Sequence, residues 1–222
     1  AAYFAKQMGI PVKTLICASN DNKVLYDFFR TGIYDKKREF ILTSSPSMDI
    51  LISSNLERLI YLSTGCDAEA NRSLMEQLNT QGSYEVTETM KEAMKDFTGG
   101  FATEAENAAE IKKVYEDTGY VIDTHTGVAS AVYRAYAEKT GDTTPTVIAS
   151  TASPYKFSHS VMEAIRGDEG SKDEFAIIDE LCSVSGVKIP AAVEEIRNAE
   201  IRHKRESDVE DMEKTVAEIL GL

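Results

Sequence analysis

The stretch IASTASPYKF, residues 148–157, joins an apolar segment to the beginning of a helix. Residues 146–149 have the composition of a β-strand, and Ser158 is a residue type that caps helices. Open α/β sheets place ligand contacts where a strand ends in small hydroxylated residues before a helix. The stretch therefore predicts an α/β fold, and Thr151 is its best candidate for a functional residue.

Two other apolar segments have the length of strands. Residues 12–18 follow a short helical pattern that Gly9 and Pro11 end, and residues 120–123 precede a helical pattern over 128–139. Strand, loop, helix and strand in this order indicate a right-handed parallel unit, so we expect a core of parallel strands. The first helical pattern has no N-cap before it, which we interpret as the sign of a fragment.

Helical periodicity prevails in the rest of the chain. It extends over residues 54–118, where Gly99-Gly100 interrupts it, and returns at 158–166, 174–183, 191–196 and 207–220. We therefore expect an incomplete α/β part (1–53), a helical insertion (54–118), an α/β part with a ligand-facing loop (119–157) and a helical C-terminal region (158–222).

Composition limits the possible functions. The 222 residues carry a formal net charge of −13, which argues against a nucleic-acid ligand because its phosphates would be repelled. No apolar run approaches the roughly 20 residues that span a bilayer, so we expect no membrane association. Cys17, Cys66 and Cys182 lie far apart, which fits a reducing cytoplasm, the location that we expect. The histidines lack the spacing of metal ligands, and we expect no metal site.

Two loops and one histidine are further candidates, each with two interpretations. Asn20-Asp21-Asn22 are typical helix caps, but a loop beyond a strand's carboxyl end can also line a pocket. Residues 43–49, TSSPSMD, can bind an anion through hydroxyls and backbone N–H groups, or simply form a turn. His125 can position a substrate or transfer a proton, or it can bond to neighbouring backbone.

Five blocks of this sequence, in the same order, resemble those of the threonine synthases, a family of pyridoxal-phosphate (PLP) enzymes. The blocks are SNDNKVL (19–25), FFRTGIY (28–34), SPSMDI with SSNLER (45–50 and 53–58), DTHT (123–126) and STASPYKF (150–157). Five blocks in order are far more specific than any one of them. Thr124, Gly127 and Ser153 depart from the proline, alanine and histidine that are frequent in the family.

The resemblance implies a fold, a reaction and a site. The fold is the parallel-sheet core of the tryptophan synthase β-like class (fold type II PLP enzymes), and the reaction converts O-phospho-L-homoserine and water to L-threonine and phosphate. Thr151 matches the threonine of the family's S-T-A block and is expected to bond to the PLP ring nitrogen. Asn20, Ser47, His125 and Lys156 are possible pocket walls. Without the resemblance, the favoured explanation of Thr151 is a hydroxyl that caps the turn after a strand.

Two segments of the family pattern are missing from this sequence. One is the G-N-F-G-N loop that binds the cofactor phosphate, and the other is the S-F-K-D type segment whose lysine attaches the cofactor. We therefore expect no catalytic residue here and no activity from the chain alone. Two alternatives stay open: another fold type II PLP lyase or dehydratase, and a non-enzymatic acidic α/β binding module.

Overall fold

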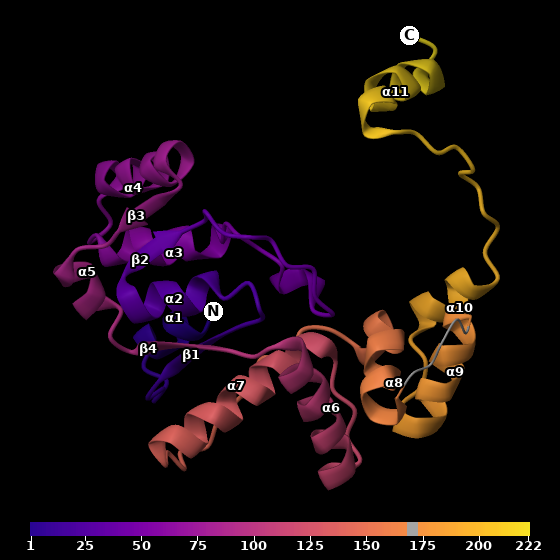
Figure 1. Cartoon of the computed structure of the whole chain (residues 1–222), viewed down its shortest axis with the longest axis horizontal. Coiled ribbons are helices and arrows are strands. Elements are labelled where there is room, and N and C mark those ends of the chain that lie inside the picture. The colour runs from indigo at the N-terminus through magenta and orange to yellow at the C-terminus, as the bar shows by residue number, and fades with distance from the viewer. Residues whose placement is uncertain (168–172) are drawn as a thin grey trace. The chain divides into compact units, whose positions relative to one another are not determined.

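The computed structural model describes residues 1–167 and 173–222 (Figure 1). It divides into two compact units, Ala1–Val187 and Lys188–Leu222. The helices of the first unit are α1 (Ala2–Gln7), α2 (Val24–Thr31), α3 (Ser54–Ser63), α4 (Ala68–Gln81), α5 (Glu88–Ala93), α6 (Glu104–Thr118), α7 (Thr124–Thr140), α8 (Ser158–Arg166) and α9 (Glu174–Ser185), with 3-10 turns η1 (Pro46–Met48) and η2 (Pro154–Phe157). Its strands are β1 (Leu15–Ser19), β2 (Ile33–Asp35), β3 (Ser83–Glu85) and β4 (Phe97–Phe101).

A parallel pair of strands, β1 and β4, lies between helices α2 and α7 (Figure 1). Strand β1 confirms the strand predicted over residues 12–18, and its pairing confirms the parallel core. Strand β4 was missed, because the sequence FTGGF contains the Gly-Gly pair that we interpreted as a break in a helical insertion. The insertion predicted over 54–118 is therefore mostly helical but contributes one strand of the parallel sheet.

The glycines of β4 allow both helices to approach the strand closely. A Cβ on Gly99 would lie 2.9 Å from the backbone of Tyr26 in α2, and a Cβ on Gly100 would lie 2.4 Å from Cγ1 of Val132 in α7. Successive residues of a strand face opposite sides of the sheet, so each glycine receives one helix. These two positions require glycine for close packing rather than for an unusual backbone conformation.

The main hydrophobic core lies around α2 and the antiparallel pair β2–β3. Phe28 is 1% exposed, and its ring lies 5.9 Å from that of Tyr34, which stacks on Tyr84 at 5.4 Å between ring centroids. The Tyr34 hydroxyl accepts a hydrogen bond from the backbone N–H of Ser53 at 2.8 Å and donates to the carbonyl of Leu51 at 3.0 Å. This core therefore fixes the segment that precedes α3.

Two predicted strands are not strands in the structure. Val121 and Ile122 are buried in an extended segment before α7, and residues 146–149 are extended, with Val147 95% exposed. β-branched residues favour extended backbone, but a strand also needs a neighbour with which to form a hydrogen-bonded ladder. Among the described residues neither segment has one, so the predictions for 120–123 and 146–149 are wrong.

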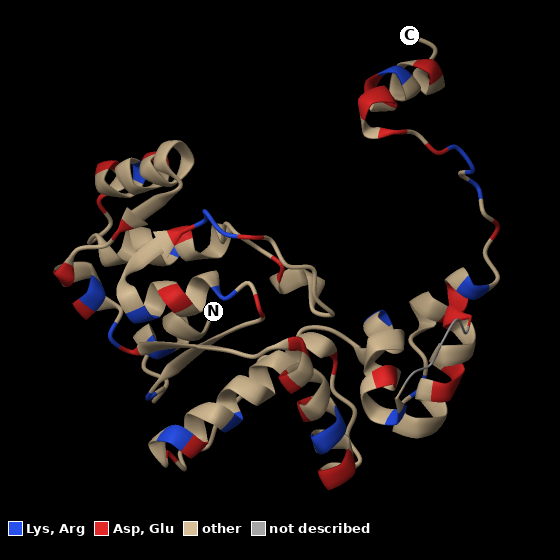
Figure 2. Ribbon diagram, in the orientation of Figure 1, with Lys and Arg blue, Asp and Glu red and all other residues tan. Residues whose placement is uncertain are grey.

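Helices α8 and α9 pack against each other and confirm the helices predicted at 158–166 and 174–183. The second unit contains α10 (Ala191–Arg197), η3 (Val209–Asp211) and α11 (Met212–Leu220), the last shorter than the predicted 207–220. Figure 2 shows that charged residues lie on α6 and α11, whereas β1 and β4 carry none. Among the described residues, no helix has the length and hydropathy to cross a bilayer.

Candidate functional site

A buried polar network joins the carboxyl end of β1 to the loop before α3. Asn20, the first residue after β1, is 1% exposed, and its Nδ2 donates to Oδ1 of Asp49 at 2.7 Å. Asn22 donates to the same oxygen at 3.2 Å and to the carbonyl of Ile41 at 2.9 Å. The other oxygen of Asp49 accepts from the backbone N–H of Thr43 at 3.0 Å. Asp49 is thus the common acceptor that closes the loop over residues 43–49 onto β1.

Most hydroxyls of this loop bond to the protein. The Thr43 hydroxyl donates to Asp49 at 2.7 Å, and the Ser45 hydroxyl accepts from Asn20 at 3.1 Å. The Ser44 hydroxyl accepts from Nδ2 of Asn107 at 3.2 Å. Ser47 differs, because its side chain is exposed and, in the described part of the chain, its hydroxyl bonds to no protein group. Only Ser47 therefore presents a hydroxyl of the loop to a ligand.

The beginning of α7 meets the tip of the same loop. The buried carboxylate of Asp123 caps the helix by accepting from the backbone N–H groups of His125 at 2.9 Å and of Thr126 at 3.3 Å. The backbone N–H of Ser47 donates to Nε2 of His125 at 3.1 Å. A carboxylate at a helix N-terminus is also favoured by the helix dipole. The cap therefore fixes the turn that carries His125.

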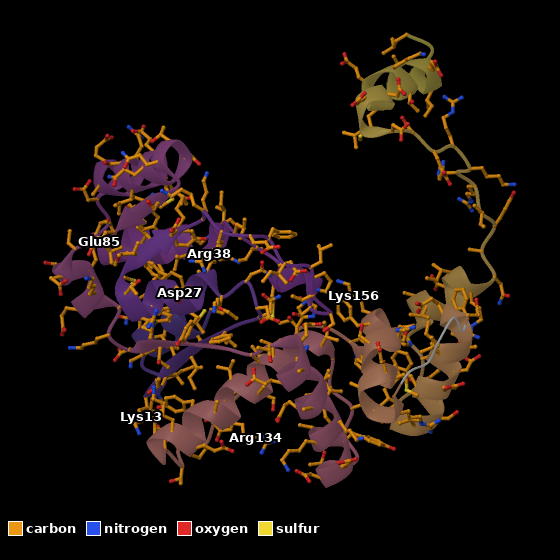
Figure 3. All side chains as sticks on the ribbon, viewed as in Figure 1. Lys13, Asp27, Arg38, Glu85, Arg134 and Lys156 are labelled. Carbon is orange, nitrogen blue, oxygen red and sulfur yellow. The ribbon has the colours of Figure 1, made fainter. Side chains whose placement is uncertain are left out.

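The stretch 150–157 lies beside this turn. The hydroxyls of Ser150 and Thr126 are 2.8 Å apart, and the ring of Phe157 lies 4.7 Å from that of His125. Lys156, labelled in Figure 3, is exposed, with its Nζ 5.4 Å from the centroid of the Phe157 ring. Thr151 is exposed, and within the described residues its hydroxyl has no hydrogen-bond partner. The turn-capping role considered for Thr151 is therefore not what the structure shows.

The structure separates the five candidate residues into two groups. Ser47, Thr151 and Lys156 are exposed, whereas the polar atoms of Asn20 and the ring nitrogens of His125 face protein groups. Ser47 contacts His125, and His125 contacts Phe157. These contacts join the 43–49 loop, the start of α7 and the stretch 150–157, which together carry every candidate except Asn20. Asn20 follows the carboxyl end of β1, and His125 lies in the first turn of α7.

Sequence reasoning misjudged or missed several contributors. Asn20 and Asn22 do not cap α2, whose N-cap is Lys23 and has no side-chain cap; instead, Oδ1 of Asn20 accepts from the Asn22 backbone N–H at 3.2 Å. Asp49 was not singled out, although a carboxylate six residues after a threonine in a hydroxyl-rich loop is a signal for an internal acceptor. Asn107 was also missed, because nothing local marks a helical asparagine as a long-range donor.

The ionisable groups near the sheet do not indicate metal or thiol chemistry. Among the residues that the structure describes, no cluster of histidine, cysteine and carboxylate side chains has the arrangement of a metal site. Burial of Cys17 in β1 raises the pKa of its thiol to about 11, which keeps it protonated near neutral pH. The chemistry that this site offers is therefore that of hydroxyls, backbone N–H groups and one lysine.

Replacing Gly127 by alanine is expected to lower the free energy of unfolding by about 2 kcal/mol. The new Cβ would lie 2.2 Å from Oδ1 of the buried Asn107 and 2.8 Å from Cγ1 of Ile111, so α6 and α7 must move apart. Without this contact, the same change within a helix would stabilise by about 1 kcal/mol. Urea unfolding monitored by circular dichroism measures the difference.

Asn107→Ala supplies the control for this prediction. It removes the amide oxygen that the new methyl would meet, so the cost of Gly127→Ala is expected to be smaller in the double variant than in the native background. Equal costs in the two backgrounds would show that the contact with Asn107 does not determine the packing of Gly127.

The chain resembles known proteins over most of its length. A family model described as threonine synthase, C-terminal, matches residues 126–219. The threonine synthase of Saccharomyces cerevisiae is 36% identical over 204 residues, which cover 85% of this chain and 40% of that protein. The human threonine synthase-like 1 is 40% identical over 168 residues, which cover 75% of this chain and 22% of that protein. The resemblance to the threonine synthases is therefore confirmed. It spans between about a fifth and two fifths of the length of these relatives.

Solved threonine synthases share the fold. The yeast enzyme superposes with a TM-score of 0.77 at 31% identity, over 99% of this chain and 44% of the enzyme. The PLP-bound threonine synthase from Brucella melitensis superposes with a TM-score of 0.69 at 38% identity, over 84% of this chain and 38% of the enzyme. The predicted fold class, an α/β fold with the parallel sheet of the PLP-dependent threonine synthases, is confirmed.

Proposed function

We propose that this chain is the carboxyl-terminal part of a cytoplasmic threonine synthase that binds PLP and acts on O-phospho-L-homoserine. The full-length enzyme would convert this substrate and water to L-threonine and phosphate. The similarity to threonine synthases supports the proposal, and the observation that carries the site assignment is the exposed hydroxyl of Thr151, which has no partner among the described residues. The neighbouring hydroxyls of Ser150 and Thr126 are 2.8 Å apart, so the segment before Thr151 is held in place.

The residues present fit PLP in their chemistry. When bound, PLP withdraws electrons from the substrate and so stabilises negative charge as protons leave its carbon atoms. The Thr151 hydroxyl is a neutral donor that suits an uncharged ring nitrogen, whereas a carboxylate would favour a protonated one. Ser47 presents a hydroxyl and Lys156 an exposed ammonium group, and both suit an anionic substrate. Asn20 and Asp49 hold the loop that carries Ser47.

Replacing Thr151 by alanine in the full-length enzyme is expected to lower kcat/KM for O-phospho-L-homoserine about 100-fold, the usual cost of one lost donor at a reacting group. Thr151→Ser keeps the hydroxyl and is expected to stay within about tenfold of the native rate. The measurement is phosphate release coupled to detection of L-threonine. Thr146→Ala is the matched control, because Thr146 is also exposed but its hydroxyl donates to the backbone of Thr144.

Two outcomes would count against the proposal. A full-length enzyme that releases ammonia from L-serine or L-threonine, and no phosphate from O-phospho-L-homoserine, would be a dehydratase of the same fold class. Thr151→Ala activity equal to that of Thr146→Ala would remove Thr151 from the site. The isolated 222-residue chain serves as the negative control, because it does not contain the S-F-K-D type segment to which the family attaches its cofactor.

A further inference from the structure

The hydrogen bonds of His125 define which of its ring nitrogens carries the proton. The backbone N–H of Ser47 lies 3.1 Å from Nε2, and a backbone nitrogen can only donate, so Nε2 accepts. In a neutral imidazole the proton then lies on Nδ1. That atom is 3.3 Å from the carboxylate of Asp123 and 3.4 Å from the hydroxyl of Thr124. The contacts of both ring nitrogens therefore fit the Nδ1–H tautomer.

The surroundings of the ring keep it in this orientation. The side chain of His125 is 13% exposed, and the ring of Phe157 lies against it at 4.7 Å. Asp123 is 1% exposed and is itself held by the N–H groups of the α7 N-terminus, so the acceptor beside Nδ1 cannot turn away. The loop that His125 contacts is also held by the bond from Asn20 to Asp49 and by the bond from Asn107 to Ser44. His125 adds an attachment at Ser47, near the tip of that loop.

We propose that His125 is a positioning residue whose Nε2 accepts the backbone N–H of Ser47 and clamps the 43–49 loop against the start of α7. Asp123 sets the tautomer, and Phe157 covers the ring. In this role His125 holds the Nδ1–H tautomer. The exposed hydroxyl of Ser47 then owes its position to a ring 78 residues away in the sequence. This role depends only on contacts within the chain, so it does not rest on the proposed reaction.

Nitrogen NMR of the native, ¹⁵N-labelled chain tests the proposal directly. At mildly alkaline pH, where an ordinary imidazole is neutral, His125 is expected to show a protonated Nδ1 and an unprotonated Nε2. A ¹⁵N–¹⁵N coupling across the hydrogen bond is expected between Nε2 and the Ser47 amide. An Nε2–H tautomer, or a Ser47 amide that couples to no imidazole nitrogen, would overturn the assignment. No variant is needed, so a substitution that impairs folding cannot obscure the result.

Two amide replacements separate the two ring nitrogens. Glutamine places its oxygen near the position of Nε2, whereas asparagine reaches only as far as Nδ1. His125→Asn is therefore expected to speed hydrogen exchange of the Ser47 amide about tenfold, the worth of one hydrogen bond, while His125→Gln keeps most of the protection. Exchange of the Val128 amide in α7 is the internal control for folding. Equal exchange at Ser47 in both variants and in the native chain would overturn the clamp.

Discussion

Replacing Phe28 by alanine is expected to lower the free energy of unfolding by about 4 kcal/mol, the largest effect that we expect from a single substitution. The ring is 1% exposed and lies 5.2 Å from Phe29, 5.9 Å from Tyr34 and 6.3 Å from Tyr84, measured between ring centroids. Its removal leaves a cavity at the centre of the main core, which the surrounding rings fill only in part. Guanidinium unfolding followed by tyrosine fluorescence measures the loss.

Phe40→Ala is the matched control for this prediction. It deletes the same side chain at a site that is 49% exposed, so a cost below about 1 kcal/mol is expected. If the two substitutions cost the same, the aromatic cluster around α2 is not the main core of the first unit.

Replacing Arg134 by alanine is expected to cost about 3 kcal/mol at neutral pH, because it leaves the buried carboxylate of Glu110 without its cation. The guanidinium donates two hydrogen bonds of 2.8 Å across α6 and α7, and the Ser130 hydroxyl donates a third at 2.7 Å. This cost is at the lower end of the range for breaking a buried ion pair, because the Arg134 side chain is 41% exposed, whereas that of Glu110 is 5% exposed. Arg72→Ala, which breaks an exposed pair with Glu69, is the control and is expected to cost well under about 1 kcal/mol.

The cost of Arg134→Ala is also expected to depend on pH. Burial alone raises the pKa of Glu110, but its hydrogen bonds with Arg134 and Ser130 outweigh burial and lower the pKa below its ordinary value. The native pair therefore stabilises the fold above the carboxyl pKa of the unfolded chain, and this contribution is lost as pH falls through the lower folded pKa. Without Arg134, burial raises the folded pKa, and protonation relieves the penalty. A cost that grows as the solution is acidified would contradict this account.

The sequence predicted elements best where local residues determine them. The helices predicted over 158–166 and 174–183 are present as α8 and α9, because the spacing of apolar residues that indicates them is local. The strands were harder, because a ladder depends on a distant partner. Residues 146–149 have strand composition but no partner among the described residues, whereas the glycine-rich β4 has one in β1.

For the candidate site, the types of residue in the sequence indicated where the site lies better than they indicated what each residue does. The loop beyond β1 was expected to line a pocket, and the bond from Asn20 to Asp49 joins it to the 43–49 loop, whose Ser47 contacts His125. Which polar groups face inward depends on pairings such as Asn20 with Asp49, which are 29 residues apart in the sequence. Nothing in the local pattern distinguishes Asn20, which bonds to the protein, from Ser47, which is exposed.

The close approach of α2 and α7 to β4 has a consequence for how this architecture tolerates sequence change. Strand β4 lies between α2 and α7 and separates them by the thickness of one strand. These two helices lie next to residues that flank the site, because Asn20 precedes α2 and Asp123 is the N-cap of α7. A single methyl group added at Gly99 or Gly100 would wedge one layer outward and widen the gap between those residues without touching either. The thickness of one strand thus sets the width of the site, and residues that contact no ligand determine it.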